Sequence, residues 1–82
     1  MKNNRLIKII EELQKRIIDF DRYRFKIDVH KDIITAQPIG PELEGYEVDV
    51  DAGSKNFDRV MDELVPKVVN LIKIYKEKSN EK

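Results

Sequence analysis

Apolar and charged residues alternate along two stretches in the middle of the chain. Residues 23–30 carry Tyr, Phe, Ile and Val at every second position, and residues 46–51 carry Tyr and two Val in the same way. A period of two is typical of a strand with one buried and one exposed face. A shorter apolar run at 33–36 lies between them. The pattern predicts three strands, over 23–30, 33–36 and 46–51.

A helical pattern precedes the strands and another follows them. Residues 4–20 and residues 56–77 each carry an apolar stripe at helical spacing. Ser54 or Asn56 is expected to cap the second helix, because either side chain can accept a backbone N–H. Pro66 lies in the middle of this helix and has no N–H to donate. It therefore either kinks the helix or divides it into two.

The order helix, three strands, helix predicts an α+β fold of the type α-β-β-β-α. We expect an antiparallel three-stranded meander with both helices packed on its apolar face. At 82 residues the chain has room for a single domain, 1–82, with a frayed tail from about residue 78 to 82.

The adjacent residues Ile33 and Ile34 cannot both face the core, because side chains alternate across a strand. A two-residue loop at Lys31 and Asp32 would oppose Val29 to Ile34 and turn Ile33 outward. A three-residue loop would reverse the two isoleucines. In either case the outer face of the sheet carries at least one isoleucine.

The loop at 37–45 contains two prolines and two glycines together with Ile39 and Leu43. It either folds these two apolar side chains onto the core or forms an exposed recognition loop.

Charge and cysteine content narrow the function classes. The chain has 16 Lys and Arg against 16 Asp and Glu, so it lacks the basic excess of a dedicated nucleic-acid binder. The absence of Cys excludes disulfides, a thiolate nucleophile and a Cys-ligated zinc site. No apolar run has the length of a signal sequence or a membrane span, which predicts a cytoplasmic protein without a membrane partner. The Lys, Ile and Glu content suits a thermophilic or AT-rich source.

Acidic residues on the third strand are the best candidates for chemistry. Glu47, Asp49 and Asp51 alternate along it, and Asp28 and His30 are expected on the same outer face. Such a face could hold a divalent metal for hydrolysis. The alternative is a solvated surface on which these acids pair across strands with Arg24 and Lys26.

No Ser or Thr has a recognisable base and orienting group, and the glycines are isolated. The sequence therefore predicts no catalytic residues, no cofactor and no enzyme.

Nucleic-acid binding is a second hypothesis. Double-stranded-RNA-binding domains share the order of elements, but the region of the chain that would begin the last helix mixes Lys55 and Arg59 with Asp58, Asp62 and Glu63 rather than carrying a lysine cluster. Base stacking on Tyr23 and Phe25 is not expected, because turning them outward would bury Arg24 and Lys26. The candidate phosphate contacts are Lys2, Arg5, Lys8, Arg22, Arg24, Lys26, Lys55 and Arg59.

Surplus apolar surface gives the leading hypothesis. The helix stripes are wide for so small a sheet, and Ile18 and Ile74 fall at or beyond their edges, while Ile33 is a candidate for the outer sheet face. Exposed apolar side chains on a small neutral domain favour association. We therefore expect a small interaction module that forms a homodimer or binds another protein.

Overall fold

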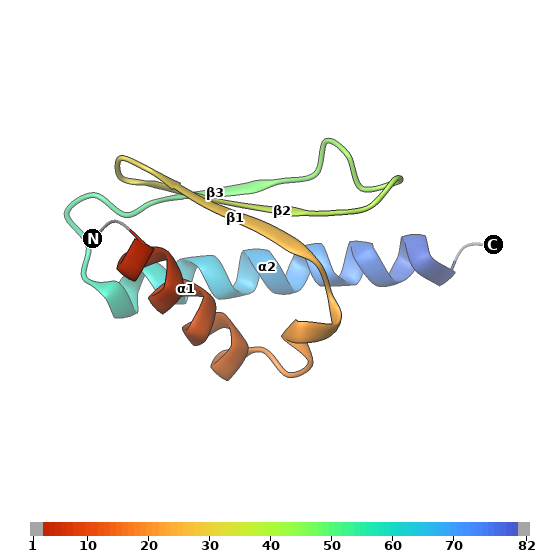
Figure 1. The fold of residues 1–82 in the computed structure, drawn as a ribbon, viewed down its shortest axis with the longest axis horizontal. Helices are drawn as coiled ribbons and strands as arrows, with labels where there is room; N and C mark the ends of the chain where they lie inside the picture. The colour runs from red at the N-terminus through yellow and green to blue at the C-terminus, as the bar shows by residue number, and fades with distance from the viewer. Residues whose placement is uncertain (1–2, 81–82) are drawn as a thin grey trace.

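The two helices pack against one face of a three-stranded sheet and leave the other face uncovered (Figure 1). The structure is a computed structural model that describes residues 3–80. It confirms the predicted order α-β-β-β-α, with a short 3-10 helix, η1, added between α1 and β1. The elements are α1 (Asn3–Arg16), η1 (Phe20–Arg22), β1 (Phe25–His30), β2 (Ile33–Pro38), β3 (Val48–Asp51) and α2 (Phe57–Asn80).

The sheet is antiparallel with the strand order β1-β2-β3, as a meander requires. Val29 is paired with Ile34, and the turn between β1 and β2 consists of Lys31 and Asp32. Lys31 adopts a left-handed conformation with φ of 57°. Ile34 is consequently 1% exposed, whereas Ile33 is 38% exposed and faces outward. Of the two alternatives for this loop, the two-residue turn is the one that forms.

The first and third strands begin two residues later than predicted. Tyr23 closes η1, with its N–H donating to the carbonyl of Phe20 at 3.1 Å, and Tyr46 lies in a turn, donating to Leu43 at 3.3 Å. The second strand instead extends two residues further, to Pro38. Pro38 is tolerated there because its missing N–H would point toward β3, which begins only at Val48.

Helix α1 ends at Arg16, so the prediction of a single helix over residues 4–20 is wrong at its C-terminal end. Asp19 takes a left-handed conformation with φ of 65°, and η1 follows directly. Ile17 and Phe20 are nevertheless both buried, because the 3-10 turn returns Phe20 to the core. Helical spacing alone could not distinguish this turn from a further turn of α-helix.

Asn56 is the residue that caps α2, because its Oδ1 accepts a hydrogen bond from the N–H of Arg59 at 2.9 Å. The helix then continues without interruption to Asn80, past the predicted end at residue 77. Pro66 is exposed and does not divide the helix. Residues 81 and 82 of the predicted tail lie outside the described residues.

Both helical stripes meet the inner sheet face at Ile34, Ala36 and Val50 to form one core. The predicted inward orientation of the aromatic residues is confirmed. Tyr23 packs edge-on against Tyr75 at 5.2 Å, and Phe25 stacks on Tyr75 at 6.4 Å. The largest fully buried side chains of this core are Ile9, Leu13, Ile34, Met61, Leu64, Val50 and Val68.

Candidate protein interaction surface

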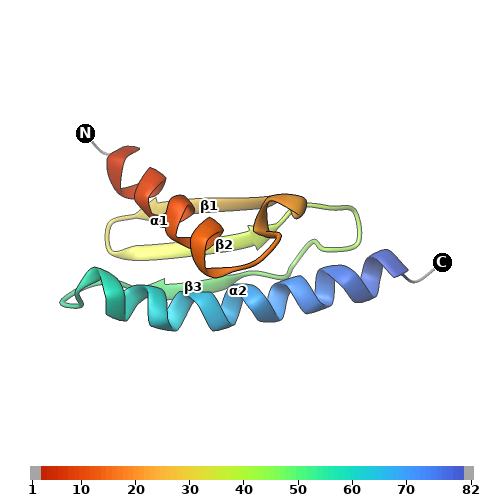
Figure 2. The ribbon, with the colours of Figure 1, turned by 90° about the horizontal axis from the view of Figure 1, so that it is seen from below.

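The outer face of the sheet is made by every second residue of the three strands. Since α1 and α2 both lie beneath the opposite face, nothing else in residues 3–80 is seen to cover it (Figures 1 and 2). Ile33 is the large apolar residue on this face, and its register partners are His30 on β1 and Asp51 on β3. The outward residues of the strands are Lys26, Asp28, His30, Ile33, Thr35, Gln37, Asp49 and Asp51.

The charges of this face do not pair in the predicted way. Lys26 Nζ lies 3.8 Å from a carboxylate oxygen of Asp28 on its own strand. The prediction that Arg24 and Lys26 pair with Glu47 and Asp49 is wrong, because β2 lies between β1 and β3. No ion pair among the described residues joins Arg24 or Lys26 to an acidic residue of the third strand.

The backbone of β1 forms an open edge of the sheet. The N–H of Ile39 donates to the carbonyl of Arg24 at 2.9 Å, which shows that the even-numbered residues of this strand point their backbone groups toward β2. By the antiparallel alternation, Phe25, Ile27 and Val29 point theirs away from the sheet. Among the described residues, no turn or side-chain hydrogen bond reaches these outward groups.

The opposite edge, formed by β3, is protected. This strand has only four residues, and Lys67 of α2 donates from Nζ to the outward carbonyl of Asp49 at 2.8 Å. Short edge strands, and edge backbone groups that are already covered, both limit further strand pairing. β1 has six residues with neither a proline nor such a contact. The two edges therefore differ, and β1 is the one available to another strand.

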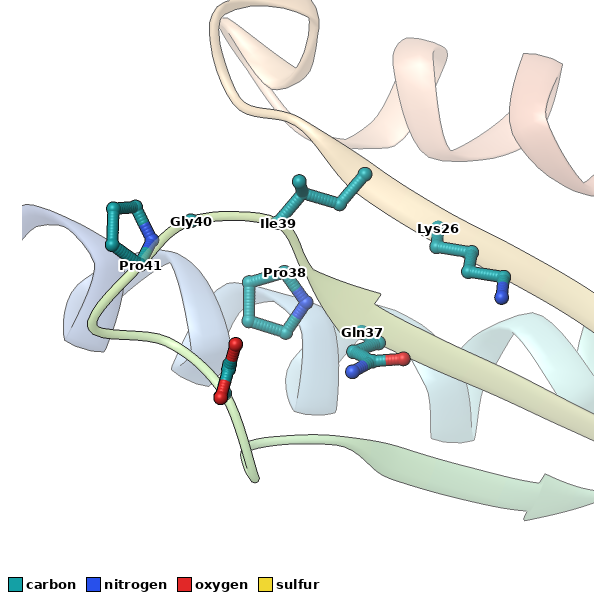
Figure 3. Close-up of a pocket in the computed structure, with 7 residues that line it drawn as sticks. Lys26, Gln37, Pro38, Ile39, Gly40 and Pro41 are labelled. Atoms are coloured by element: carbon teal, nitrogen blue, oxygen red, sulfur yellow. The ribbon is translucent and has the colours of Figure 1, made fainter.

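A shallow hollow of about 510 Å³ lies at the end of the sheet, between β1 and the loop that joins β2 to β3 (Figure 3). The sequence left open whether this loop packs its two apolar side chains onto the core or is exposed, and the structure shows one of each. Leu43 is buried against the core, whereas Ile39 is 48% exposed beside the hollow. The residues that line it are Lys26, Gln37, Pro38, Ile39, Gly40, Pro41 and Glu44.

The candidate interaction residues Ile18, Ile33 and Ile74 do not form a single patch. Ile18 is 88% exposed in the segment between α1 and η1, on the helix side of the sheet. Ile33 is on the outer sheet face, and Ile74 is half-buried on α2. A partner that contacts Ile33 would therefore not contact Ile18 through the same surface.

The candidate nucleic-acid residues are dispersed over separate elements. Arg5 and Lys8 are on α1, Arg22 is in η1, and Arg24 and Lys26 lie at or beside β1. Lys55 and Arg59 lie at the start of α2, and Lys2 is outside the described residues.

Acidic and aromatic neighbours accompany several of these cations. Lys8 Nζ lies 5.5 Å from the centre of the Phe57 ring. Lys55 Nζ lies 2.8 Å from a carboxylate oxygen of Glu63, and the hydrogen bond that it donates lowers the pKa of that carboxyl below its ordinary value. The charge of Lys55 is thus already partly neutralised within the chain.

The acidic residues of β3 gain no metal-binding partners from the fold. Within residues 3–80, no group of three or more His, Asp or Glu side chains is close enough to share a metal ion. Asp28 and Asp49 flank Thr35 in register but belong to opposite edge strands.

Comparison of the chain with protein families, with curated proteins and with solved structures finds no match. In the part of the chain that the structure describes, no helix combines the length and the apolar character needed to cross a membrane.

The apolar pattern of the sequence points to exposed isoleucines and not to the open backbone of β1. A signal for this edge was present, because the first strand of a meander always lies at an edge and this one contains no proline. The hollow had no comparable signal, since it depends on how the loop after β2 folds.

Proposed function

We propose that the protein is a small non-enzymatic interaction module that forms a homodimer or binds another protein. The single observation that carries the proposal is the open edge of β1, which presents the unpaired backbone groups of Phe25, Ile27 and Val29 beside an uncovered sheet face. An exposed edge of this length is a ready template for a strand from another chain.

Exposed apolar side chains near this edge support the proposal further. Ile7 on α1 is 52% exposed, and Ile33 lies one strand away from the edge on the outer face. Nucleic-acid binding has weaker support, because the cations are dispersed and Lys55 is held by Glu63. A metal-dependent hydrolase has weaker support still, because the described acids do not converge on one point.

Light scattering across a dilution series tests the proposal in its homodimeric form. We expect about twice the chain mass of 9.7 kDa at high concentration and a fall toward 9.7 kDa on dilution. A mass of 9.7 kDa at every concentration would contradict self-association, and the module would then have to act on a different protein.

A further inference from the structure

The geometry points to one mode of self-association, in which β1 pairs antiparallel with β1 of a second copy about a two-fold axis at Ile27. This inference rests on the proposed function and specifies its partner and register. The result would be a continuous six-stranded sheet with all four helices on the same side.

The outward backbone groups of β1 satisfy the hydrogen-bonding requirement of such a pair. Phe25, Ile27 and Val29 each direct an N–H and a C=O toward the open edge. With the axis at Ile27, this residue lies opposite its own copy, and Phe25 lies opposite Val29 of the partner copy. In an antiparallel ladder these are hydrogen-bonded pairs, so the outward groups of all three residues find partners.

Charge complementarity selects this register. Lys26 and Asp28 flank Ile27 on the outer face, and both side chains are largely exposed. The axis at Ile27 places Lys26 directly opposite Asp28 of the partner copy, and the symmetry repeats the pair. Opposite charges at facing positions stabilise a strand pair.

The neighbouring registers lack this complementarity. Moving the axis to Lys26 places two ammonium groups face to face, and moving it to Asp28 does the same with two carboxylates. Like charges directly opposite each other destabilise a strand pair. In an isologous contact the same surface of both copies must be complementary to itself. This six-residue strand is self-complementary when the two-fold axis passes through Ile27.

The helix layer also provides apolar surface for a second copy. The first turns of α1 extend past β1 on the helix side of the sheet (Figure 2). Ile7 is exposed there, and Leu6 and Ile10 are half-buried. A strand added at the edge of β1 would lie over these turns, and the inward side chain of Phe25 from the partner copy would meet them.

Charge reversal tests the register, with light scattering at low ionic strength as the measurement because salt screens exposed charges. K26E presents only carboxylates at the two flanking positions, and D28K presents only ammonium groups. Each single variant would place like charges opposite each other in the dimer. We expect each to associate about tenfold more weakly than the wild type, or more weakly still.

Two combinations restore the complementary pairs. The double variant K26E/D28K exchanges the two charges and should form a dimer again. An equimolar mixture of K26E with D28K should form a heterodimer at concentrations where each variant alone associates only weakly. The mixture also controls for misfolding, because a chain that has lost its fold could not regain a partner in this way.

Different outcomes would contradict the β1 register and the proposed homodimer. A wild-type dimer whose mass is unchanged in both single variants, or single variants that stay monomeric when mixed, would overturn the β1 pairing while leaving an interaction module with another surface. A wild type that is monomeric at every concentration would overturn the homodimer itself.

Discussion

Replacing Ile34 with lysine is expected to unfold most of the protein, whereas the same replacement at Ile33 should leave it folded. Ile34 is 1% exposed among the core residues of both helices, so the new ammonium group would be buried without a partner. An unpaired buried charge is among the most destabilising changes in proteins, and we expect a loss of about 4 kcal/mol or more in the free energy of unfolding.

The neighbouring residue supplies the matched control. Ile33 faces outward and lies directly opposite Asp51 on β3, so a lysine there gains an oppositely charged neighbour. Urea denaturation followed by circular dichroism should place I33K within about 0.5 kcal/mol of the wild type. Equal losses for I33K and I34K would contradict the pairing of Val29 with Ile34 and the two-residue turn.

Replacing Leu64 with alanine is expected to lower the free energy of unfolding by about 3 kcal/mol. Leu64 lies on α2 beneath the sheet and has no exposed surface. The substitution removes buried methyl groups and leaves a cavity that the surrounding side chains fill only in part. In a domain of this size, such a loss is a large fraction of the total stability.

Val69 on the same helix controls for effects on the helix itself. It is 37% exposed, and alanine is a better helix former than valine. V69A should therefore change the free energy of unfolding by less than about 0.5 kcal/mol in the same denaturation experiment. Similar losses for V69A and L64A would contradict the placement of the apolar stripe of α2 against the sheet.

The order of the elements and the composition of the core could be predicted because they depend on periodicity. Strict alternation identified the inner face of β1, and helical spacing identified the buried positions of α2. Alternation also shows that only one of Ile33 and Ile34 can be buried, and that the length of the preceding turn decides which one. The two-residue turn requires a left-handed conformation at Lys31. The turn contains no glycine or asparagine, the residues that usually indicate this conformation.

The ends of the elements could not be predicted from the same pattern. The buried position of Phe20 is compatible both with a continuation of α1 through residue 20 and with a turn that leads into η1, so its apolar character does not separate the two. Tyr23 continues the alternation of β1 but lies outside it, held by η1 and by the ring of Tyr75. Apolar spacing predicts which side chains are buried. It predicts the backbone conformation only within a helix or strand that no turn interrupts.

The surface was predicted less well, because it depends on which strands are neighbours. The positive charge of Lys26 predicts a pair with the acidic residues of the third strand, but β2 lies between the two strands. It lies instead beside Asp28, at the open edge. In the proposed dimer, Lys26 and Asp28 of one copy would lie opposite Asp28 and Lys26 of the other.

Amide hydrogen exchange along β1, followed residue by residue at increasing protein concentration, tests the open edge most directly. Lys26, Asp28 and His30 direct their amides toward β2 and should exchange slowly at every concentration. We predict that the amides of Phe25, Ile27 and Val29 exchange rapidly in dilute solution and slowly at concentrations where the molar mass doubles. Rapid exchange of these three amides in the dimer would contradict the pairing of β1 with a second copy of itself.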